Sequence, residues 1–485
     1  MRSTFKRQKR SKKRFEDRIS DLPNSLIAQI LSLLPTKYAV STSILSKRWK
    51  QSWTSITNLD FYDKLLFHHT DDFTVESLQR SFTSFVNRVL LHHASCVQRF
   101  RLRCSEHCGA SLVNGWIAHT LLRNVQELDL CLAETFVLPQ DLFTCRTLVV
   151  LKLDSDECGI LTVPASVSLP SLKILRLSHF DCEDDDSINR FLFGCPVLEE
   201  LSMSDCLGEN VSVVNIFAPR LTSLSMDDCM YPSPHNFKPK IVLDTPALLY
   251  LKIREYSADG RYLVENLHRL IRADILLDAG DASAKGLTDL LKGMSNVQFL
   301  RLSPPAICLS NALLPKFHNV TYLELGAMPN DGWKLLSKLL ENCPHLGTLV
   351  FGKGLRDEDW YYPLHWNLPQ NVPSCLFSHL KRRKRLDNPD YAVTSCKSLR
   401  FATKLLIKGS PGLLGLGYDY EGFTELIQNP AWNMPSCFCF HLKVIEFRRF
   451  GREKEEWEIV DYFLRKLKVN IVYGYAGLEW TLYRT

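Results

Sequence analysis

The sequence lacks any segment long and apolar enough to cross a membrane. Its 485 residues contain no uninterrupted apolar run of about 18, the length that a spanning helix needs. The N-terminus is basic but has no apolar core segment, so we expect no secretory signal. Charge alone leaves a mitochondrial presequence open, although the basic stretch shows no clear apolar face. With 45% hydrophobic and 23% charged residues, we expect a folded protein of the nucleus and/or cytoplasm.

Common catalytic motifs are also missing. There is no phosphate-binding P-loop, no G-x-S-x-G nucleophile elbow and no H-E-x-x-H zinc motif. The acidic cluster of Asp184, Asp185 and Asp186 admits a metal-binding interpretation, but it stands where a helix is expected to begin. Carboxylates there favour the positive end of the helix dipole, and we prefer that interpretation. We expect no enzyme activity, no catalytic residue, no cofactor and no metal.

Paired CxxC spacing is absent, although the chain contains 16 cysteines. Without a secretory signal, that many cysteines predict reduced thiols rather than a disulfide framework. One cluster carries several metal-ligand types, namely His92, His93, Cys96, Cys104, His107 and Cys108. A zinc site needs four convergent ligands. We prefer to interpret this cluster as buried cysteines and surface histidines.

Positive charge is scarce beyond the first residues. Residues 2–18 hold nine Lys or Arg against Glu16 and Asp17, a net of +7, whereas the whole chain carries +6. The rest of the chain is therefore near neutral, which does not indicate a general nucleic-acid surface. Residues 1–16 are predicted to be a basic disordered tail, which is either a solvated arm or a nuclear localisation signal.

The middle of the chain repeats one phrase, an apolar residue followed at +3 and +5 by two more. The phrases begin 22 to 28 residues apart, at Val97, Val125, Leu148, Leu172, Leu198, Leu221, Leu248, Leu270, Val297, Val320 and Leu346. The last two apolar residues of each phrase point to one face of a strand. Helical stretches such as 187–194 and 287–294 lie between phrases. The pattern predicts an α/β fold, a leucine-rich-repeat solenoid of stacked strand–helix units over residues 61–365.

Residues 20–36, SDLPNSLIAQILSLLPT, predict a helix of about three turns with more leucine and isoleucine than one buried stripe holds. Pro23 should lie in its first turn and Pro35 should end it. Together with Trp49 and its surroundings, residues 17–60 make a unit near the lower size limit for independent folding. A partner or the adjoining repeats must therefore cover the surplus apolar surface.

The segment DRISDLPNSLIAQILSLLPTKYAVSTSILSKRWKQSWTSITNLDF resembles an F-box, of the plant type joined to leucine-rich repeats and a C-terminal FBD domain. The DRISDLP opening, the ILSLLPTK stretch, the LSKRW tract and the NLDF exit carry the resemblance. It implies a small helical F-box at 17–60 that binds the Skp-type adaptor of an SCF ubiquitin ligase. The implied adaptor contacts are Leu22, Pro23, Leu26, Ile30, Leu31, Leu34, Pro35, Val40, Leu45, Ser46, Arg48 and Trp49. The sequence alone does not separate interface from core, and it leaves open that these residues only cap the first repeat.

The phrase that opens the family's FBD domain occurs twice, at 366–381 and at 432–443. Only the second copy continues with an alternating strand at 444–450 and an amphipathic helix at 452–468. We therefore expect the second copy to belong to a domain that caps the repeats.

The region between the two copies departs from the family. We predict an FBD-like region over residues 366–470 that contains a duplicated or inserted segment at 381–431, followed by an atypical tail at 471–485. The run KRRKR at 381–385 is either a second nuclear signal or an exposed charge run.

A ligand of the repeats is expected on the strand positions between the inward leucines. The charged candidates are Lys152, Arg176, Lys252, Arg301 and Glu324. They should be exposed on one face of the sheet, where they either contact a substrate or are merely solvated. The resemblance implies that the repeats recruit a protein substrate for ubiquitination, with cullin and RING subunits reached through the adaptor. The alternatives are a repeat scaffold without a ubiquitin role and a nucleic-acid binder that uses the basic tail; we expect no membrane partner.

Overall fold

The chain divides into two compact units, residues 1–133 and 134–485, in the computed structural model. The structure describes residues 22–65, 75–104, 108–132, 137–208, 210–227, 239–255, 261–277, 284–303, 314–325, 339, 342–346, 348–352, 404–408, 444–448, 470–472 and 479–483. The predicted basic tail, the KRRKR run and the helix at 452–468 lie outside these residues.

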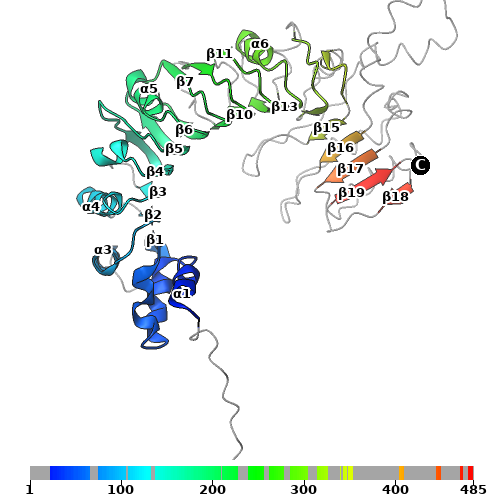
Figure 1. Ribbon diagram of the computed structural model, residues 1–485. Helices are drawn as coiled ribbons and strands as arrows, with labels where there is room; N and C mark the ends of the chain where they lie inside the picture. The colour runs from blue at the N-terminus through cyan, green and yellow to red at the C-terminus, as the bar shows by residue number, and fades with distance from the viewer. Residues whose placement is uncertain are drawn as a thin grey trace, which may run out of the picture. The chain divides into compact units, whose positions relative to one another are not determined.

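Short helices open the first unit (Figure 1). They are α1 (Asn24–Leu31), α2 (Thr36–Ser41) and the 3₁₀ segments η1 (Thr42–Ile44) and η2 (Trp49–Ser55). Their core consists of Ile27, Leu31, Ala39, Trp49 and Ile56, all at most 4% exposed.

Helix α1 is shorter than the sequence predicts. Pro23 is its N-cap, with φ −58° and ψ 147°, and so precedes the helix instead of lying in its first turn. The helix ends at Leu31, and the Ser32 hydroxyl donates to the Ala28 carbonyl at 2.8 Å. Pro35 then stands in an extended conformation before α2, because a residue without an N–H suits a helix start better than a helix interior.

The rest of the first unit alternates strands and helices. In chain order these are β1 (Asn58–Tyr62), η3 (Asp63–Leu65), α3 (Val75–His92), β2 (Arg99–Arg103), α4 (Ala110–Leu121) and β3 (Glu127–Leu132). The three strands are parallel, and Leu59, Phe100 and Leu128 share one register row in the buried face.

Strand β1 is a repeat strand that the sequence reasoning missed. Ile56, Leu59 and Phe61 follow the same +3 and +5 spacing and are at most 1% exposed. The phrase was hidden because it overlaps the last residues of the predicted F-box, where the NLDF exit was interpreted as part of that motif. The stack of repeats therefore begins within residues 17–60.

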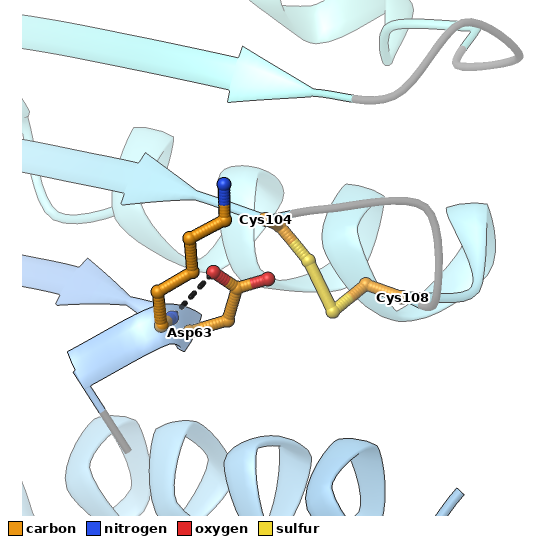
Figure 2. Close-up of a disulfide and its surroundings, with 4 residues drawn as sticks. Asp63, Cys104 and Cys108 are labelled. Atoms are coloured by element: carbon orange, nitrogen blue, oxygen red, sulfur yellow. Dashed lines mark hydrogen bonds between the residues drawn. A yellow bond between two sulfur atoms is a disulfide. The ribbon is translucent and has the colours of Figure 1, made fainter. Parts of the chain in front are cut away.

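A disulfide joins Cys104, directly after β2, to Cys108, just before α4 (Figure 2). The expectation of reduced thiols throughout is wrong for this pair. The bond spans four positions and closes one local loop, so it is not the framework of a disulfide-rich fold. Asp63, drawn beside it in Figure 2, is buried and accepts a hydrogen bond from the Lys64 backbone N–H at 2.6 Å.

The cysteine–histidine cluster differs from its interpretation in two further ways. Cys96 is exposed, whereas His93 is buried at 2% exposure and its Nε2 lies 2.6 Å from the Ile56 carbonyl oxygen. This contact gives the buried ring a polar partner and satisfies a backbone carbonyl that the fold has removed from water. A partner 37 residues away along the chain could not be read from the spacing.

The second unit contains a long main sheet. Its strands are β4 (Val150–Leu161), β5 (Ile174–Cys182), β6 (Glu200–Cys206), β8 (Ser223–Asp227), β10 (Tyr250–Glu255), β12 (Arg272–Leu277), β13 (Phe299–Ser303), β14 (Tyr322–Leu325), β15 (Thr348–Gly352), β16 (Lys404–Lys408), β17 (Val444–Arg448), β19 (Glu479–Tyr483) and β18 (Asn470–Val472), in this spatial order. Pairing is parallel as far as β17 and antiparallel for β19 and β18.

The repeat leucines form the buried face of this sheet. One register row joins Leu151, Leu175, Leu201, Leu224, Leu251, Ala273, Leu300 and Leu323, each at 0% exposure. The predicted α/β repeat fold is thus confirmed, and its core is a continuous ladder of apolar side chains.

The segments that return between strands are not all helical. Helices α5 (Asp185–Phe193) and α6 (Ala284–Gly293) and the 3₁₀ segment η4 (Gln140–Thr144) occur, but β7 (Val213–Phe217), β9 (Lys240–Asp244) and β11 (Arg261–Glu265) form a second parallel sheet. Figure 1 shows α5, β7, β11 and α6 on the same side of the second unit. Valine and isoleucine are frequent in these return strands and favour the extended conformation.

The acidic cluster begins helix α5, as expected. Asp184 is the N-cap, and its carboxylate accepts a hydrogen bond from the Ser187 backbone N–H at 2.7 Å. Asp184 accepts one hydrogen bond from the Ser187 hydroxyl and one from the Ser187 N–H, and both lower the pKa of its carboxyl group. Asp185 accepts a hydrogen bond from the Val213 N–H at 3.0 Å, so the cluster also holds the start of β7.

Two regions predicted to be atypical contribute strands. Strand β16 lies inside the 381–431 segment and pairs in parallel with β15 and β17. The 471–485 tail supplies β19 and the last residues of β18, which pair antiparallel to each other, and β19 also pairs with β17. The predicted strand at 444–450 corresponds to β17.

Candidate functional site

The first unit exposes an apolar strip on its short helices and the turns that follow them. We define the apolar strip as Leu26, Ile30, Leu33, Leu34, Tyr38, Ile44 and Leu45, all at least 37% exposed. Helix α1 is apolar on two sides, because Ile27 and Leu31 enter the core while other apolar residues of the same helix stay in water. The excess of leucine in the sequence is therefore exposed in this unit.

The predicted adaptor contacts fall into separate groups in the structure. Pro23, Leu26, Ile30, Leu34, Leu45 and Arg48 are exposed, and Leu22, Pro35, Val40 and Ser46 are partly exposed. Leu31 and Trp49 are buried at 1% and 4% exposure, so they support the unit from inside. The structure thus distinguishes surface residues of the F-box from core residues, a distinction that the sequence alone does not make.

The sequence reasoning missed part of the strip. Leu33 and Ile44 are its most open members, at 83% and 87% exposure, and Tyr38 lies between them in sequence at 47%. Their apolar character was visible in the sequence. Leu33 lies after the end of α1 at Leu31, whereas the expected first helix extended to Pro35.

Arg48 ties the start of the unit to its end. Its guanidinium donates to Asn24 Oδ1, through Nε at 3.2 Å and Nη2 at 3.0 Å, and also to the Leu22 carbonyl. The LP turn and the KRW tract of the sequence are therefore joined directly. This contact fixes the N-terminal entry of α1, next to exposed Leu26.

Polar groups connect the helices to the first repeat strand. The Thr36 hydroxyl accepts from the Asp60 N–H at 2.7 Å, and the Ser32 hydroxyl accepts from the Thr57 N–H at 3.1 Å. The Asn58 side chain donates to the Ser32 carbonyl at 3.1 Å. The strip residues remain exposed beside this junction, which argues against the alternative that they only cap the first repeat.

In the second unit, the face of the main sheet opposite the buried leucines carries the predicted substrate positions. We call it the open face. Its middle register row is Lys152, Arg176, Ser202, Ser225, Lys252, Asp274, Arg301 and Glu324. The five predicted residues thus occupy one row across the sheet, as the repeat spacing implied.

The expectation that all five are exposed is wrong for Glu324. It is only 4% exposed, and its carboxylate accepts from the Tyr322 hydroxyl at 3.0 Å and lies 3.3 Å from Arg301 Nε. A buried carboxylate needs such partners. Tyr322 lies two residues earlier on the same strand and Arg301 lies on the neighbouring strand, so both side chains pack over the Glu324 carboxylate.

The neighbouring register row of the open face was not predicted. It places Tyr250, Arg272, Phe299 and Tyr322 on adjacent strands, and we call these four residues the aromatic row. Each lies two residues before a middle-row position and so points to the same face. Extending the alternation by one step along each strand would have identified them from the sequence.

Comparison with known proteins gives the family. Residues 19–60 match the F-box domain, residues 113–273 match the repeats described as "FBD-associated F-box protein At5g56370, LRR repeats", and residues 428–467 match the FBD domain. F-box/FBD/LRR-repeat protein At4g26340 of Arabidopsis thaliana is 32% identical over 447 residues, which cover 87% of this chain and 100% of that protein. The chain belongs to the F-box/FBD/LRR-repeat family.

Other relatives agree with this assignment. F-box/LRR-repeat protein At3g59200 of Arabidopsis thaliana is 37% identical, over 69% of this chain and 68% of its own length. FBD-associated F-box protein At4g10400 of the same plant is 32% identical, over 76% of this chain and 85% of its own length. The family and the order of F-box, repeats and FBD are as the resemblance implied.

Family membership gives the exposed strip and the open face a context. An F-box implies binding of a Skp-type adaptor, and F-box/LRR proteins are generally non-catalytic adaptors. The FBD match contains the second copy of the duplicated phrase, at 432–443, and not the first, at 366–381. The second copy is therefore the one that belongs to the FBD domain.

Four buried thiols of the repeats are unsuited to nucleophilic chemistry. Burial raises the pKa of Cys182, Cys195, Cys206 and Cys343 to about 12 each, so these thiols stay protonated and are poor nucleophiles. Among the described residues, no three or more His, Cys, Asp or Glu side chains gather in a way that could hold a metal ion. None of the described helices is both long and apolar enough to cross a membrane.

Proposed function

We propose that this protein is the substrate-recognition subunit of an SCF-type ubiquitin ligase. The F-box docks the Skp-type adaptor, which connects the chain to cullin and RING subunits, and the leucine-rich repeats recruit a protein substrate. Other subunits transfer ubiquitin, and this chain positions the substrate. The observation that carries the proposal is the apolar strip, because the F-box packs a core of its own and still exposes these side chains.

The strip is large enough to form an interface. Burying one leucine or isoleucine side chain contributes about 1.5–3 kcal/mol. Burying four or five of them can exceed the cost of association, which is at least about 4 kcal/mol. The strip is also held rigidly, since Arg48 fixes the start of α1 and Ser32 and Thr36 fix its end to β1. Little backbone conformational entropy is then lost on binding.

The test is co-expression with a plant Skp-type adaptor and cullin, followed by affinity purification through the full-length chain. The double substitution Ile30→Asp and Leu34→Asp should abolish adaptor recovery, because it places charge in the centre of the docked surface. Leu122→Asp is the matched control, since Leu122 is 85% exposed but lies outside the strip. It should recover adaptor as the wild type does.

Retention of the adaptor by the Ile30/Leu34 double variant would contradict docking through the strip. Failure of the wild-type chain to recover any adaptor would instead favour a repeat scaffold without a ubiquitin role. Circular dichroism of each variant establishes that the fold is intact before binding is compared.

We also propose that the protein acts in the nucleus and/or the cytoplasm. The support is the basic tail of residues 1–16, whose charge density suits a nuclear localisation signal.

A further inference from the structure

The aromatic row exposes rings and one cation side by side on the open face of the repeats. Phe299 is 42% exposed, Tyr250 and Tyr322 are partly exposed, and 53% of the Arg272 side chain is accessible. The rings of Phe299 and Tyr322 have centroids 5.9 Å apart, and the Arg272 guanidinium lies 5.6 Å from the Tyr250 ring centroid. Adjacent strands therefore present a continuous surface of rings around one cation.

Two sunken carboxylates hold this surface in place. Asp274 accepts from the Tyr250 hydroxyl at 3.0 Å and from Arg272, through Nε at 3.1 Å and Nη2 at 3.0 Å. Glu324 accepts from the Tyr322 hydroxyl at 3.0 Å. Only 5% of the Asp274 side chain and 6% of the Glu324 side chain are exposed. The carboxylates of Asp274 and Glu324 therefore lie beneath the rings, while the rings and the Arg272 guanidinium reach solvent.

This arrangement is pre-organised for an anionic and partly apolar ligand. The bonds to Asp274 use two of the five N–H donors of Arg272, and the others suit a carboxylate of a ligand. Aromatic rings that are already fixed lose little entropy when an apolar side chain packs on them. A cationic ligand would instead meet Arg272 in the middle of the row.

The dimensions indicate a short extended segment. The row crosses three strand spacings of about 4.8 Å, roughly 14 Å in all, and an extended chain rises about 3.3 Å per residue. A segment of about five residues spans that length.

Charge favours a peptide over a nucleic acid. The open face from β8 to β14 carries Lys252, Arg254, Arg272 and Arg301 against Asp227, Asp274 and Glu324. This near balance offers too little positive charge to follow a phosphate backbone, which binds through many cations.

We propose that the aromatic row binds an extended acidic peptide segment of the recruited protein, in which a carboxylate and aromatic side chains stand two residues apart and so point to the same side. The carboxylate pairs with Arg272, and the aromatic side chains two and four residues further on pack on Phe299 and Tyr322. The identity of the recruited protein as a ubiquitination substrate rests on the proposed function, but the binding itself does not.

The test is fluorescence polarisation with the full-length chain. The probe is a fluorescein-labelled peptide with a central Asp-Asp-Phe-Glu-Phe segment, whose first, third and fifth side chains share one face, and Gly-Ser flanks. The comparison probes are the same peptide with Lys at each acidic position and a single-stranded oligouridylate. The wild type should bind the acidic peptide in preference to both, and added NaCl should weaken that binding.

The variants Arg272→Gln and Phe299→Ala should each weaken binding at least tenfold. Arg176→Gln is the matched control, because Arg176 is a half-exposed open-face arginine that bonds Glu200 through Nε at 3.0 Å and Nη2 at 2.7 Å, as Arg272 bonds Asp274. The affinity of the Arg176→Gln protein for the acidic peptide should stay within twofold of the wild-type affinity. Absence of binding, equal losses for Arg272→Gln and Arg176→Gln, or tighter binding of the Lys peptide or the oligouridylate would overturn the proposal.

Adaptor recovery by the same Arg272→Gln protein separates the two proposals. If that protein recovers adaptor while the wild type ignores the acidic peptide, the recognition proposal fails and the ligase proposal stands. If the wild type binds the peptide but recovers no adaptor, the recognition proposal stands and the ligase proposal fails.

Discussion

At the scale of single residues, His93 links the F-box exit to the repeat helices. Its Nε2 lies 2.6 Å from the Ile56 carbonyl oxygen, and Arg123 Nη1 lies 3.3 Å from its Nδ1. A neutral ring with the proton on Nε2 satisfies both contacts, because Nε2–H then donates and Nδ1 accepts from the guanidinium. Burial, and to a smaller extent the charge of Arg123, lowers the pKa of His93.

This pKa shift predicts a loss of stability in acid. The folded state holds His93 neutral, so its contribution is present above the unfolded-state pKa of about 6.5 and is lost as pH falls through the lower folded-state value. We expect the free energy of unfolding of the wild type to fall between pH 7 and pH 5. His93→Gln should be less stable at pH 7 but should show a shallower decline. Urea unfolding across this pH range is the measurement.

His92→Gln serves as the control, because His92 is an exposed neighbour in the same turn of α3. Its pH profile should follow the wild type. Parallel profiles for His93→Gln and the wild type would show that protonation of His93 does not govern the decline.

Single residues also show how far the sequence could be interpreted. The inward leucines were predictable because their spacing is a property of one strand. The burial of His93 and Glu324 was not, because their partners Ile56 and Arg301 come from other repeats or from the F-box. The sequence also does not show which leucines of the F-box are exposed, because their exposure depends on where α1 ends.

At the scale of elements, close packing between neighbouring return segments limits side-chain size. Gly194 follows α5 directly, and a Cβ there would lie 2.9 Å from the Val167 backbone oxygen and would also meet the Val167 side chain. Glycine is therefore required by the approach of the preceding segment to the end of the helix.

Two glycine substitutions should act in opposite directions. Gly194→Ala should destabilise the second unit by about 1–3 kcal/mol, because the added methyl group must displace backbone. Gly115→Ala should stabilise α4 by about 0.5–1 kcal/mol, since nothing lies within 4 Å of its Cβ position and alanine favours a helix. Urea unfolding followed by far-ultraviolet circular dichroism measures both. Equal effects of the two substitutions would contradict the packing described for Gly194.

The elements themselves were only partly predictable. Strands of the main sheet follow from the repeat phrase, and α5 and α6 follow from helical stretches identified in the sequence. The return strands β7, β9 and β11 do not, because each is short and gains stability by pairing with a strand from the next repeat. Local pattern could not reveal a partner that lies more than twenty residues away.

At the scale of the whole molecule, the two units present different surfaces. On the sheet of the first unit, Arg101 pairs with Asp129 at 2.9 Å and with Asp60 at 3.8 Å, and Arg99 pairs with Glu127 at 2.6 Å. Burial raises the pKa of Asp60, although Arg101 opposes this shift. Those charges largely compensate one another, as Arg272 and Asp274 do in the second unit. The first unit instead offers the apolar strip.

The basic tail makes a prediction about the whole protein. Deleting residues 2–16 from a fluorescent fusion should lower the nuclear-to-cytoplasmic ratio in plant cells, because the deletion removes eight of the chain's basic residues. Adaptor recovery should not change, because the strip lies downstream of the deletion. An unchanged ratio would show that the tail is not the nuclear signal.

A stack with this register can change length in steps of one strand. Strand β16 lies between β15 and β17 with each residue paired in parallel on both sides, although it comes from the segment between the two copies of the FBD phrase. Such a segment adds one strand, about 4.8 Å wide, and restores the hydrogen-bonding edge for the strand that follows. An inserted strand at this position therefore leaves the pairing of the following strand intact. The sheet can therefore gain or lose a strand at this end while the strands of the earlier repeats keep their register.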